Sequence, residues 1–411
     1  MSASPSILRP FAVRSFRFQW PADLATSWAA EMEAIILGWF VLVETQSVLA
    51  LALYGALRML GTLLAPAFAM AGDRLGYRNL LCVMRGTYLV CAAAIATLAL
   101  TGNATPTAVL AVALVGGLVQ PNDIAMRNLL VGQTMPPALL TPAMGIARTT
   151  MDSARIAGAV AGAGLVAAMG MGAAYLAVSA FYLVSVLLIL GADASRARIV
   201  AADVKPWADL REGLVHIWTE PHLRAAILIA FLVNLTAYPL SGSLLAHVAR
   251  DIYGLDQRGL GWLVAAWATG ALAGSLLLST VLASAGPARL TLFWGVVWFG
   301  LNAAFALTTD WRIGAPLLAM CGLAQSLCVI PIAVMLLRTT SSVYRARVMG
   351  VRMLAVYGFP LGLLAAGPLV QAWGFAATGA IYSAAGLAAL IAIGVRWRAT
   401  LWNAGAPANR V

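Results

Sequence analysis

A small set of charged side chains lies deep inside long apolar stretches of this sequence. The acids are Asp23, Glu31, Glu33, Asp123 and Asp152, and the bases are Arg58, Arg85, Arg127, Arg148, Arg155 and Arg352. A charge at the centre of a bilayer costs at least ~2.5 kcal/mol, so such residues are usually paired or functional. Because a partly dehydrated carboxylate can exchange a proton near neutral pH, the chemistry that these acids support is proton transfer.

Helical spacing sorts several of these charges into groups. Asp123 and Arg127 are four residues apart and share a helix face, and Arg148, Asp152 and Arg155 share another. Both groups can neutralise themselves by pairing within one helix. For Arg155 this structural pairing is the favoured interpretation, and a place beside Asp152 in a central cavity is the alternative.

Glu31 and Glu33 are only two positions apart, roughly 200° around a helix, so they cannot both face one cavity. We expect one of them to line a central cavity and the other to reach a basic partner such as Arg58. Either acid is therefore a candidate for the group that couples proton movement to another process. Asp23 lies nearer the end of its apolar stretch and is expected to reach water.

Composition places the whole chain in a membrane. Of 411 residues, 62% are hydrophobic and 10% are charged, with a mean hydropathy of +0.89. Soluble chains are ~45–50% apolar and about 25% charged, so a soluble core could not hide this much apolar surface. The four cysteines lie in apolar runs, so neither a disulfide framework nor a metal site follows, and no cofactor is expected.

Twelve apolar segments are long enough to cross a bilayer, which takes ~20 residues. Each must be helical, because in lipid only a helix satisfies its own backbone groups. The expected fold is therefore all-α and integral to the membrane, with twelve transmembrane helices in two pseudo-symmetric halves of six. The segments lie near 19–44, 47–71, 79–101, 106–131, 139–168, 172–191, 224–249, 259–284, 288–308, 312–337, 345–371 and 375–396.

Basic residues predict the orientation of these segments. They gather at the N-terminus, after the second, sixth, eighth and tenth segments, and in the C-terminal tail, whereas Arg250, Arg258 and Arg312 lie on the other side. This asymmetry predicts that both termini are cytoplasmic, in a multi-pass protein of the plasma (inner) membrane. The formal net charge of +11 thus reflects topology, and no nucleic-acid partner is indicated.

The predicted organisation is a first half at 1–191, a linker at 192–223 and a second half with its tail at 224–411. The linker carries Leu210, Leu214, Ile217 and Trp218 at roughly helical spacing, which indicates an amphipathic helix on the cytoplasmic surface or an ordinary surface helix. A short repeat supports duplication. Met144-Gly145-Ile146 and Met349-Gly350-Val351 open corresponding segments, and each is followed within two residues by an arginine.

The turn after the second segment is Gly72-Asp73-Arg74-Leu75-Gly76-Tyr77-Arg78. Further motifs are Phe16-Arg17-Phe18, an Ala154-Arg155-Ile156-Ala157-Gly158 stretch, Pro221-His222-Leu223-Arg224, and Arg345-Ala346-Arg347-Val348-Met349-Gly350. Together they resemble the major facilitator superfamily of secondary transporters, in the branch that includes the enterobactin exporter and macrolide efflux proteins. The turn departs from the family pattern at Ala69 and Tyr77, and Ala159 stands where a proline is usual.

The resemblance implies a cytoplasmic gate built from Gly72, Asp73, Arg74, Gly76 and Arg78. In such a gate Asp73 would meet the start of the 345–371 segment near Gly350, where a helix N-terminus favours an acid, and a basic residue low on the fourth segment, for which Arg127 is the candidate. Each contact would be worth ~0.5–2 kcal/mol, enough to bias two conformations without locking one.

The resemblance and the intramembrane acids favour a monomeric, proton-coupled exporter of a lipophilic or amphipathic small molecule, working by alternating access. An importer or facilitator of the same fold, a protein that moves lysolipids, and a non-transporting membrane sensor remain alternatives. An enzyme is disfavoured, because the sequence shows no nucleotide-binding loop and only three histidines.

Overall fold

The computed structural model describes residues 8–193, 206–280, 282, 286–341 and 344–403. Every described element in these ranges is a helix. The chain forms two compact units, one of residues 1–45 and 57–202 and the other of residues 46–56 and 203–411. Some of the basic residues on which the predicted orientation rests lie outside the described residues, namely Arg196, Arg198 and Lys205 of the linker and Arg410 of the tail.

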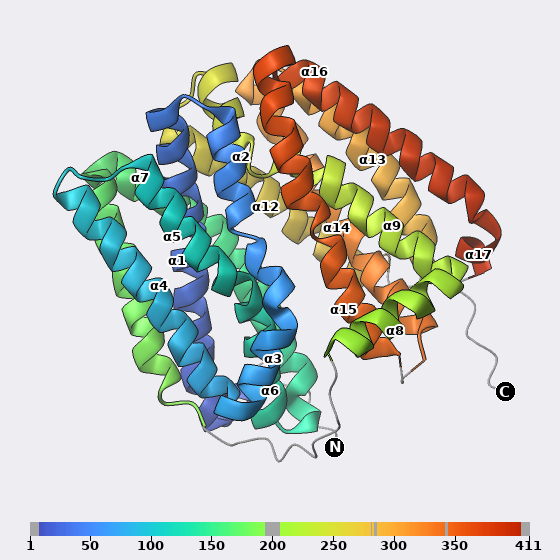
Figure 1. Ribbon diagram of the computed structural model, residues 1–411, viewed down its shortest axis with the longest axis horizontal. Helices are drawn as coiled ribbons and strands as arrows, with labels where there is room; N and C mark the ends of the chain where they lie inside the picture. Colours follow the sequence, from blue (N-terminus) through green and yellow to red (C-terminus); the bar gives the residue numbers. More distant parts are fainter. Residues whose placement is uncertain (1–7, 194–205, 281, 283–285, 342–343, 404–411) are drawn as a thin grey trace. The chain divides into compact units, whose positions relative to one another are not determined.

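The first unit contains η1 (Arg9–Ala12), α1 (Arg14–Thr45), η2 (Leu60–Leu64), α3 (Ala65–Leu75), α4 (Tyr77–Leu100), α5 (Pro106–Val119), η3 (Gln120–Asn122), α6 (Asp123–Thr134) and α7 (Pro137–Ile189). Within it α7 packs along both α1 and α4 (Figure 1). Small residues permit the contact with α1, because a Cβ at Gly162 would lie 2.8 Å from the Cα of Met32.

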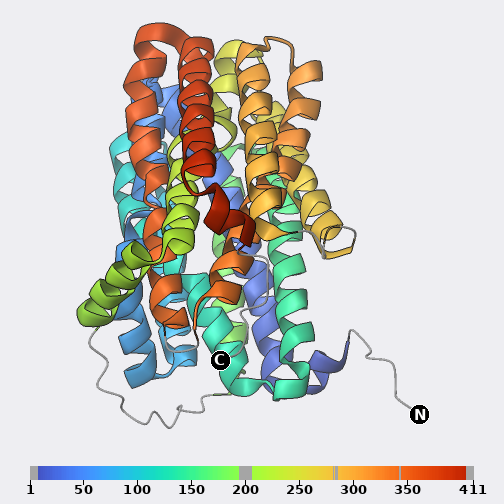
Figure 2. The same cartoon turned by 90° about the vertical axis from the view of Figure 1, so that its right-hand side faces the viewer.

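The second unit contains α2 (Val48–Leu57), apart from its last residue, together with α8 (Pro206–Thr219), α9 (Pro221–Thr236), α10 (Tyr238–Ser241), α11 (Leu245–His247), η4 (Val248–Ile252), α12 (Gln257–Thr280), α13 (Pro287–Leu307), α14 (Trp311–Thr339), α15 (Arg345–Ala355), α16 (Gly358–Arg396) and α17 (Arg398–Asn403). Within it α16 packs against α9 and α13, and α14 against α12 and α13 (Figure 2). Its core includes Trp298, Phe299 and Cys328, all nearly fully buried.

Eight described helices are long and apolar enough to cross a membrane, and Val48–Leu64 and Pro221–Thr236 are shorter apolar helices. Two of the long helical stretches cover two expected segments each. They break at Gly170 (φ 79°) and Gly374 (φ 81°), left-handed conformations that glycine adopts without steric cost. Both breaks fall where the sequence places a boundary between segments, and the prediction of twelve crossings rests on them and on the shorter helices.

Several of the expected membrane-spanning segments are not single continuous helices. The second segment breaks after Leu57 into η2, the fourth at Gln120–Asn122, and the seventh at Ala237 and again at Gly242–Leu244. Pro121 explains the second of these breaks, because proline lacks the N–H that would continue the helical hydrogen bonding.

The predicted linker helix is present as α8, but its apolar residues do not form one buried stripe. Ile217 is fully buried, whereas Leu214 and Trp218 are exposed. Only part of the apolar surface of α8 therefore packs on the protein.

Candidate functional site

Two of the helix breaks meet inside the first unit. A Cβ at Gly61 would lie 2.1 Å from the carbonyl oxygen of Leu118, and one at Gly117 would lie 2.0 Å from that of Leu57, so only glycine fits at either position. The Asn122 amide donates a hydrogen bond to the Gly61 carbonyl at 2.7 Å, satisfying a backbone group freed by the break. This junction holds Arg58 and Gln120, the residues at the two breaks, beside each other.

A cavity of about 200 Å³ adjoins the junction. Its charged lining residues come from several elements of the first unit and include Glu31, Arg58 and Arg155. The complete lining is Thr26, Ser27, Ala30, Glu31, Arg58, Met59, Gln120, Pro121, Asp123, Ile124, Arg127, Met151 and Arg155. Interrupted helices around a cavity with charged lining residues are a common way for membrane transporters to build a binding site.

Glu31 and Arg155 face each other across this cavity. The Arg155 Nε lies 3.5 Å from the Glu31 Oε1, and the two side chains are 31% and 30% exposed. The approach of α7 to α1 depends on Gly158, because a Cβ there would lie 2.9 Å from the Glu31 Cβ. Arg155 therefore pairs with a different helix, which corrects the favoured interpretation of pairing within its own helix.

Asp152 lies apart from the cavity lining. Its carboxylate accepts a hydrogen bond from the Arg148 Nε at 3.1 Å, which confirms the i, i+4 pairing expected from the sequence. Asp152 is buried while the Arg148 side chain is 59% exposed. Of the three charges that share this face of α7, only Arg155 reaches the cavity.

Glu33 connects to the cavity through a chain of hydrogen bonds. The Arg58 Nη2 donates to the Gln120 Oε1 at 3.0 Å, the Gln120 Nε2 donates to the Tyr182 hydroxyl at 3.4 Å, and that hydroxyl donates to the Glu33 Oε2 at 2.8 Å. Arg58 is also the positive charge that acts on the Glu33 carboxylate. Glu31 thus lines the cavity while Glu33 points elsewhere and is influenced by Arg58.

A buried quartet of charges, formed by Asp23, Arg85, Asp123 and Arg127, borders the cavity, and Asp123 and Arg127 are also part of the cavity lining. Arg85 pairs closely with Asp23, and Arg127 pairs closely with Asp123. The cross contacts are longer, at 3.8 Å from the Arg85 Nε to Asp123 and 3.6 Å from the Arg127 Nε to Asp23. Two negative and two positive charges balance, which is how a site removed from water keeps charged groups.

The buried quartet corrects two expectations. Asp23 is only 8% exposed and is held by two arginines, so it does not reach water as its position in the sequence suggested. Arg127 is 7% exposed, pairs with Asp123 as its spacing predicted, and donates to the Ser27 hydroxyl at 2.8 Å. Among the described residues its acidic partners are thus Asp23 and Asp123, and Asp73 is not one of them.

The Asp73 turn joins α3 to α4. Gly76 has a φ of 83°, and a Cβ at Gly72 would lie 2.4 Å from the Tyr77 ring, so both glycines are required for the turn. Asp73 is exposed and accepts a hydrogen bond from the Tyr77 hydroxyl at 2.5 Å. Arg74 is exposed, and Arg78 donates to Asn79. Gly350 belongs to the second unit, so its contact with Asp73 stays a prediction.

This arrangement of charged and polar side chains around a cavity can bind a small molecule within a membrane. Among the described residues, no group of three or more His, Cys, Asp or Glu side chains is placed to hold a metal ion. A cavity lined by charged side chains and bounded by broken helices, in a chain with eight described span-length helices, is typical of the class of membrane transporters.

The family assignment is direct. The sequence model that describes the Major Facilitator Superfamily matches residues 24–256, which is more than half of the chain. The protein therefore belongs to that family. It is therefore a multi-pass membrane protein and a secondary transporter of a small molecule, and not an enzyme.

Individual relatives are more distant. The chain is 28% identical over 363 residues to the multidrug efflux pump Tap of Mycolicibacterium fortuitum, covering 83% of this chain and 85% of Tap. Among solved structures it resembles the nucleoside transporter NupG, with a TM-score of 0.72, 14% identity and coverage of 93% of this chain and 99% of that one. A D-xylose-proton symporter aligns with a TM-score of 0.69, 12% identity and coverage of 92% and 97%. These two likenesses concern the fold alone.

Proposed function

We propose that this protein exports a lipophilic or amphipathic small molecule across the plasma membrane, driven by inward movement of protons. It works as a monomer with both termini in the cytoplasm and alternates between two conformations. Export is supported by the similarity to the multidrug efflux pump Tap over most of both chains. The branch resemblance seen in the sequence motifs points the same way.

The observation that carries proton coupling is the chain from Arg58 through Gln120 and Tyr182 to Glu33. It connects a cavity-lining cation with a carboxylate outside the cavity lining. A change at Arg58 can therefore alter the hydrogen bonding of Glu33, which is the linkage that coupling needs. Glu31 and Arg155 supply a second acid–base pair that a charged or polar part of the substrate can compete with.

We also propose that the α3–α4 turn forms a cytoplasmic gate, made of Gly72, Asp73, Arg74, Gly76 and Arg78. The exposed Asp73 carboxylate, held by Tyr77 at the α3–α4 turn, has oxygen lone pairs left for a further partner. Gly350, at the start of the helical stretch after Tyr344, remains the proposed partner site. Arg127, the other expected partner of Asp73, contacts Asp23 and Asp123 among the described residues and is not part of the gate that we propose.

The test uses purified protein in proteoliposomes with an imposed pH gradient and a fluorescent lipophilic dye as the transported probe. We expect the wild type to transport the dye when a pH gradient is imposed. Glu33→Gln should transport it at least about tenfold more slowly, because loss of an essential proton-transfer group lowers a rate by more than this. Tyr182→Phe removes only the hydroxyl that bridges to Glu33 and is expected to slow gradient-driven transport. Glu44→Gln, an exposed acid on the same helix α1, is the matched control and should transport normally.

The possible outcomes distinguish the question of which residues couple transport to protons from the question of the direction in which the substrate moves. If Glu31→Gln and Glu33→Gln both retain gradient-driven transport, these carboxylates are not the coupling groups. If the dye moves in the same direction as the protons, the protein is an importer of the same fold. Movement of labelled lysolipid with no movement of any dye would replace the drug-type substrate with a lipid.

A further inference from the structure

The helix α8 is fastened to the start of α15 by specific contacts. The Arg347 Nη1 lies 2.9 Å from the Glu212 Oε2, and the His216 ring stacks on the Tyr344 ring at 4.2 Å between centroids with an interplanar angle of 12°. A Cβ at Gly213 would lie 2.9 Å from the Arg347 carbonyl oxygen, so the two helices approach closely there. These contacts hold α8 against the start of α15 within the second unit.

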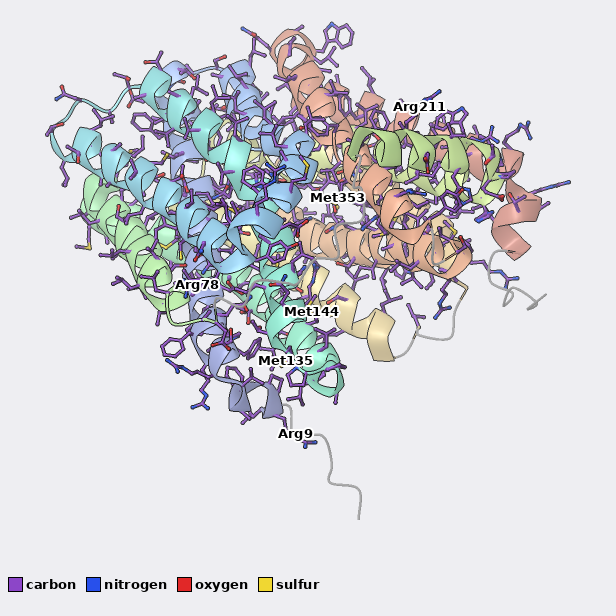
Figure 3. All side chains as sticks on the ribbon, turned by 60° about the horizontal axis from the view of Figure 1, so that its bottom comes forward. Arg9, Arg78, Met135, Met144, Arg211 and Met353 are labelled. Atoms are coloured by element: carbon purple, nitrogen blue, oxygen red, sulfur yellow. The ribbon has the colours of Figure 1, made fainter. Side chains whose placement is uncertain are left out.

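A second cavity, of about 430 Å³, lies along this contact. It is lined by Arg211, Glu212, Val215, His216, Thr219 and Tyr344. The charge of Glu212 is balanced by Arg347, which leaves Arg211 as the cation that a ligand in the cavity would meet. Within the part of the chain that the structure describes, Arg211 forms no ion pair. It is exposed on α8, where Figure 3 labels it.

An apolar surface continues from this cavity along α8. Leu214, Val215 and Trp218 are 38%, 56% and 54% exposed, although Ile217 on the same helix is fully buried. Val215 belongs both to this apolar surface and to the cavity lining. A cation beside a cavity, next to an exposed apolar strip, matches a molecule with an anionic head and a hydrocarbon tail.

The neighbourhood of α8 indicates which molecule that is. Only Glu220 separates α8 from α9, the helix that corresponds to the seventh expected crossing, so Trp218 lies three residues before that crossing. Tryptophan is favoured at the interface between bilayer and water. α8 also turns away from the axis of α9, as a helix lying along an interface would (Figures 1 and 2).

We propose that this cavity binds the phosphate headgroup of an anionic phospholipid of the adjoining leaflet, with the lipid tail along Leu214, Val215 and Trp218. Arg211 supplies the charge that recognises the phosphate, and the Tyr344 hydroxyl and His216 ring border it. Because the same residues fasten α8 to the start of α15, an occupied site holds these two helices together. This inference goes beyond the proposed transport function and does not depend on it.

The test compares the protein in nanodiscs of phosphatidylcholine with and without phosphatidylglycerol. Native mass spectrometry counts retained lipid, and hydrogen exchange follows the peptide covering residues 211–219. We expect preferential retention of phosphatidylglycerol and slower exchange in this peptide. Arg211→Gln should weaken retention about fivefold, the usual contribution of one basic residue near a charged membrane.

Two further arms keep the test decisive. Arg258→Gln removes an exposed arginine from another part of the second unit and should leave retention unchanged. Trp218→Ser should weaken retention of the whole lipid, because it removes apolar contact with the tail. Equal retention by wild type and Arg211→Gln would overturn the proposal, and protection by soluble glycerol phosphate as strong as by the lipid would overturn the lipid assignment. Neither readout requires transport.

Discussion

The buried quartet predicts that stability losses at Arg85 and Asp23 are strongly non-additive. Arg85→Gln removes a fully buried guanidinium and leaves two buried carboxylates to share Arg127. Removing one partner of a buried ion pair costs ~3–5 kcal/mol, and we expect a loss of this size. The double variant Arg85→Gln/Asp23→Asn leaves the balanced pair Arg127–Asp123, so it should be ~1–3 kcal/mol more stable than the sum of the single losses.

The measurement is the free energy of unfolding of the purified variants in mixed micelles with increasing dodecyl sulfate. Circular dichroism follows the loss of helix, and all variants are compared at one pH. Arg258→Gln is the control, because this exposed arginine forms no ion pair among the described residues and should change stability little. If the losses at Arg85 and Asp23 add within ~0.5 kcal/mol, the four charges do not act as one electrostatic unit and the reasoning is refuted.

Two further predictions follow from the same unit. Gly158→Ala places a Cβ 2.9 Å from that of Glu31 and should cost ~1–3 kcal/mol by overpacking, with reduced transport. Gly164→Ala, which meets nothing within 4 Å, should change neither thermal stability nor transport, and equal behaviour of the two variants would contradict this packing argument. Asp73→Asn should keep the fold, because the amide oxygen still accepts from Tyr77, yet it should lower transport; normal transport would remove the gate role.

Contacts within one helix could be predicted from the sequence, whereas among the relations between helices described above only the influence of Arg58 on Glu33 was anticipated. The pairs Asp123–Arg127 and Arg148–Asp152 follow from a spacing of four residues, which helix geometry converts directly into proximity. The pair Glu31–Arg155 joins residues 124 positions apart, and no spacing rule indicates which helices become neighbours. Arg85 was visible as an intramembrane charge, but its pairing with Asp23 depends on how α4 and α1 are placed in the first unit.

The helix breaks also differ in whether the sequence indicates them. The break at Gln120–Asn122 has a signal in the sequence, because Pro121 cannot continue the hydrogen bonding of α5. The break after Leu57 contains no proline in residues 58–64, and Pro66 marks only the start of α3 that follows. It arises where Gly61 and Gly117 let two backbones approach, and a glycine in an apolar run gives no indication of its partner. The cavity beside Arg58 was therefore beyond what the sequence alone could predict.

The two glycine breaks mark corresponding positions in a repeated backbone. Gly170 and Gly374 have nearly the same conformation, with φ of 79° and 81° and ψ of 169° and 166°. Gly158 lies as many residues before Gly170 as Gly362 lies before Gly374, so these two glycines correspond. Both pack tightly against a neighbouring helix. By the same count Arg148 corresponds to Arg352.

Asp152 and Arg155, however, correspond to Val356 and Phe359. The packing glycine thus recurs in both copies, while the acid and the cavity-lining cation occur only in the first. The same asymmetry holds for the other intramembrane acids of the sequence, which all precede the linker. Because the second copy keeps the packing glycine without Asp152 and Arg155, the backbone repeat serves the fold, and the proposed proton coupling draws on side chains that only the first copy has.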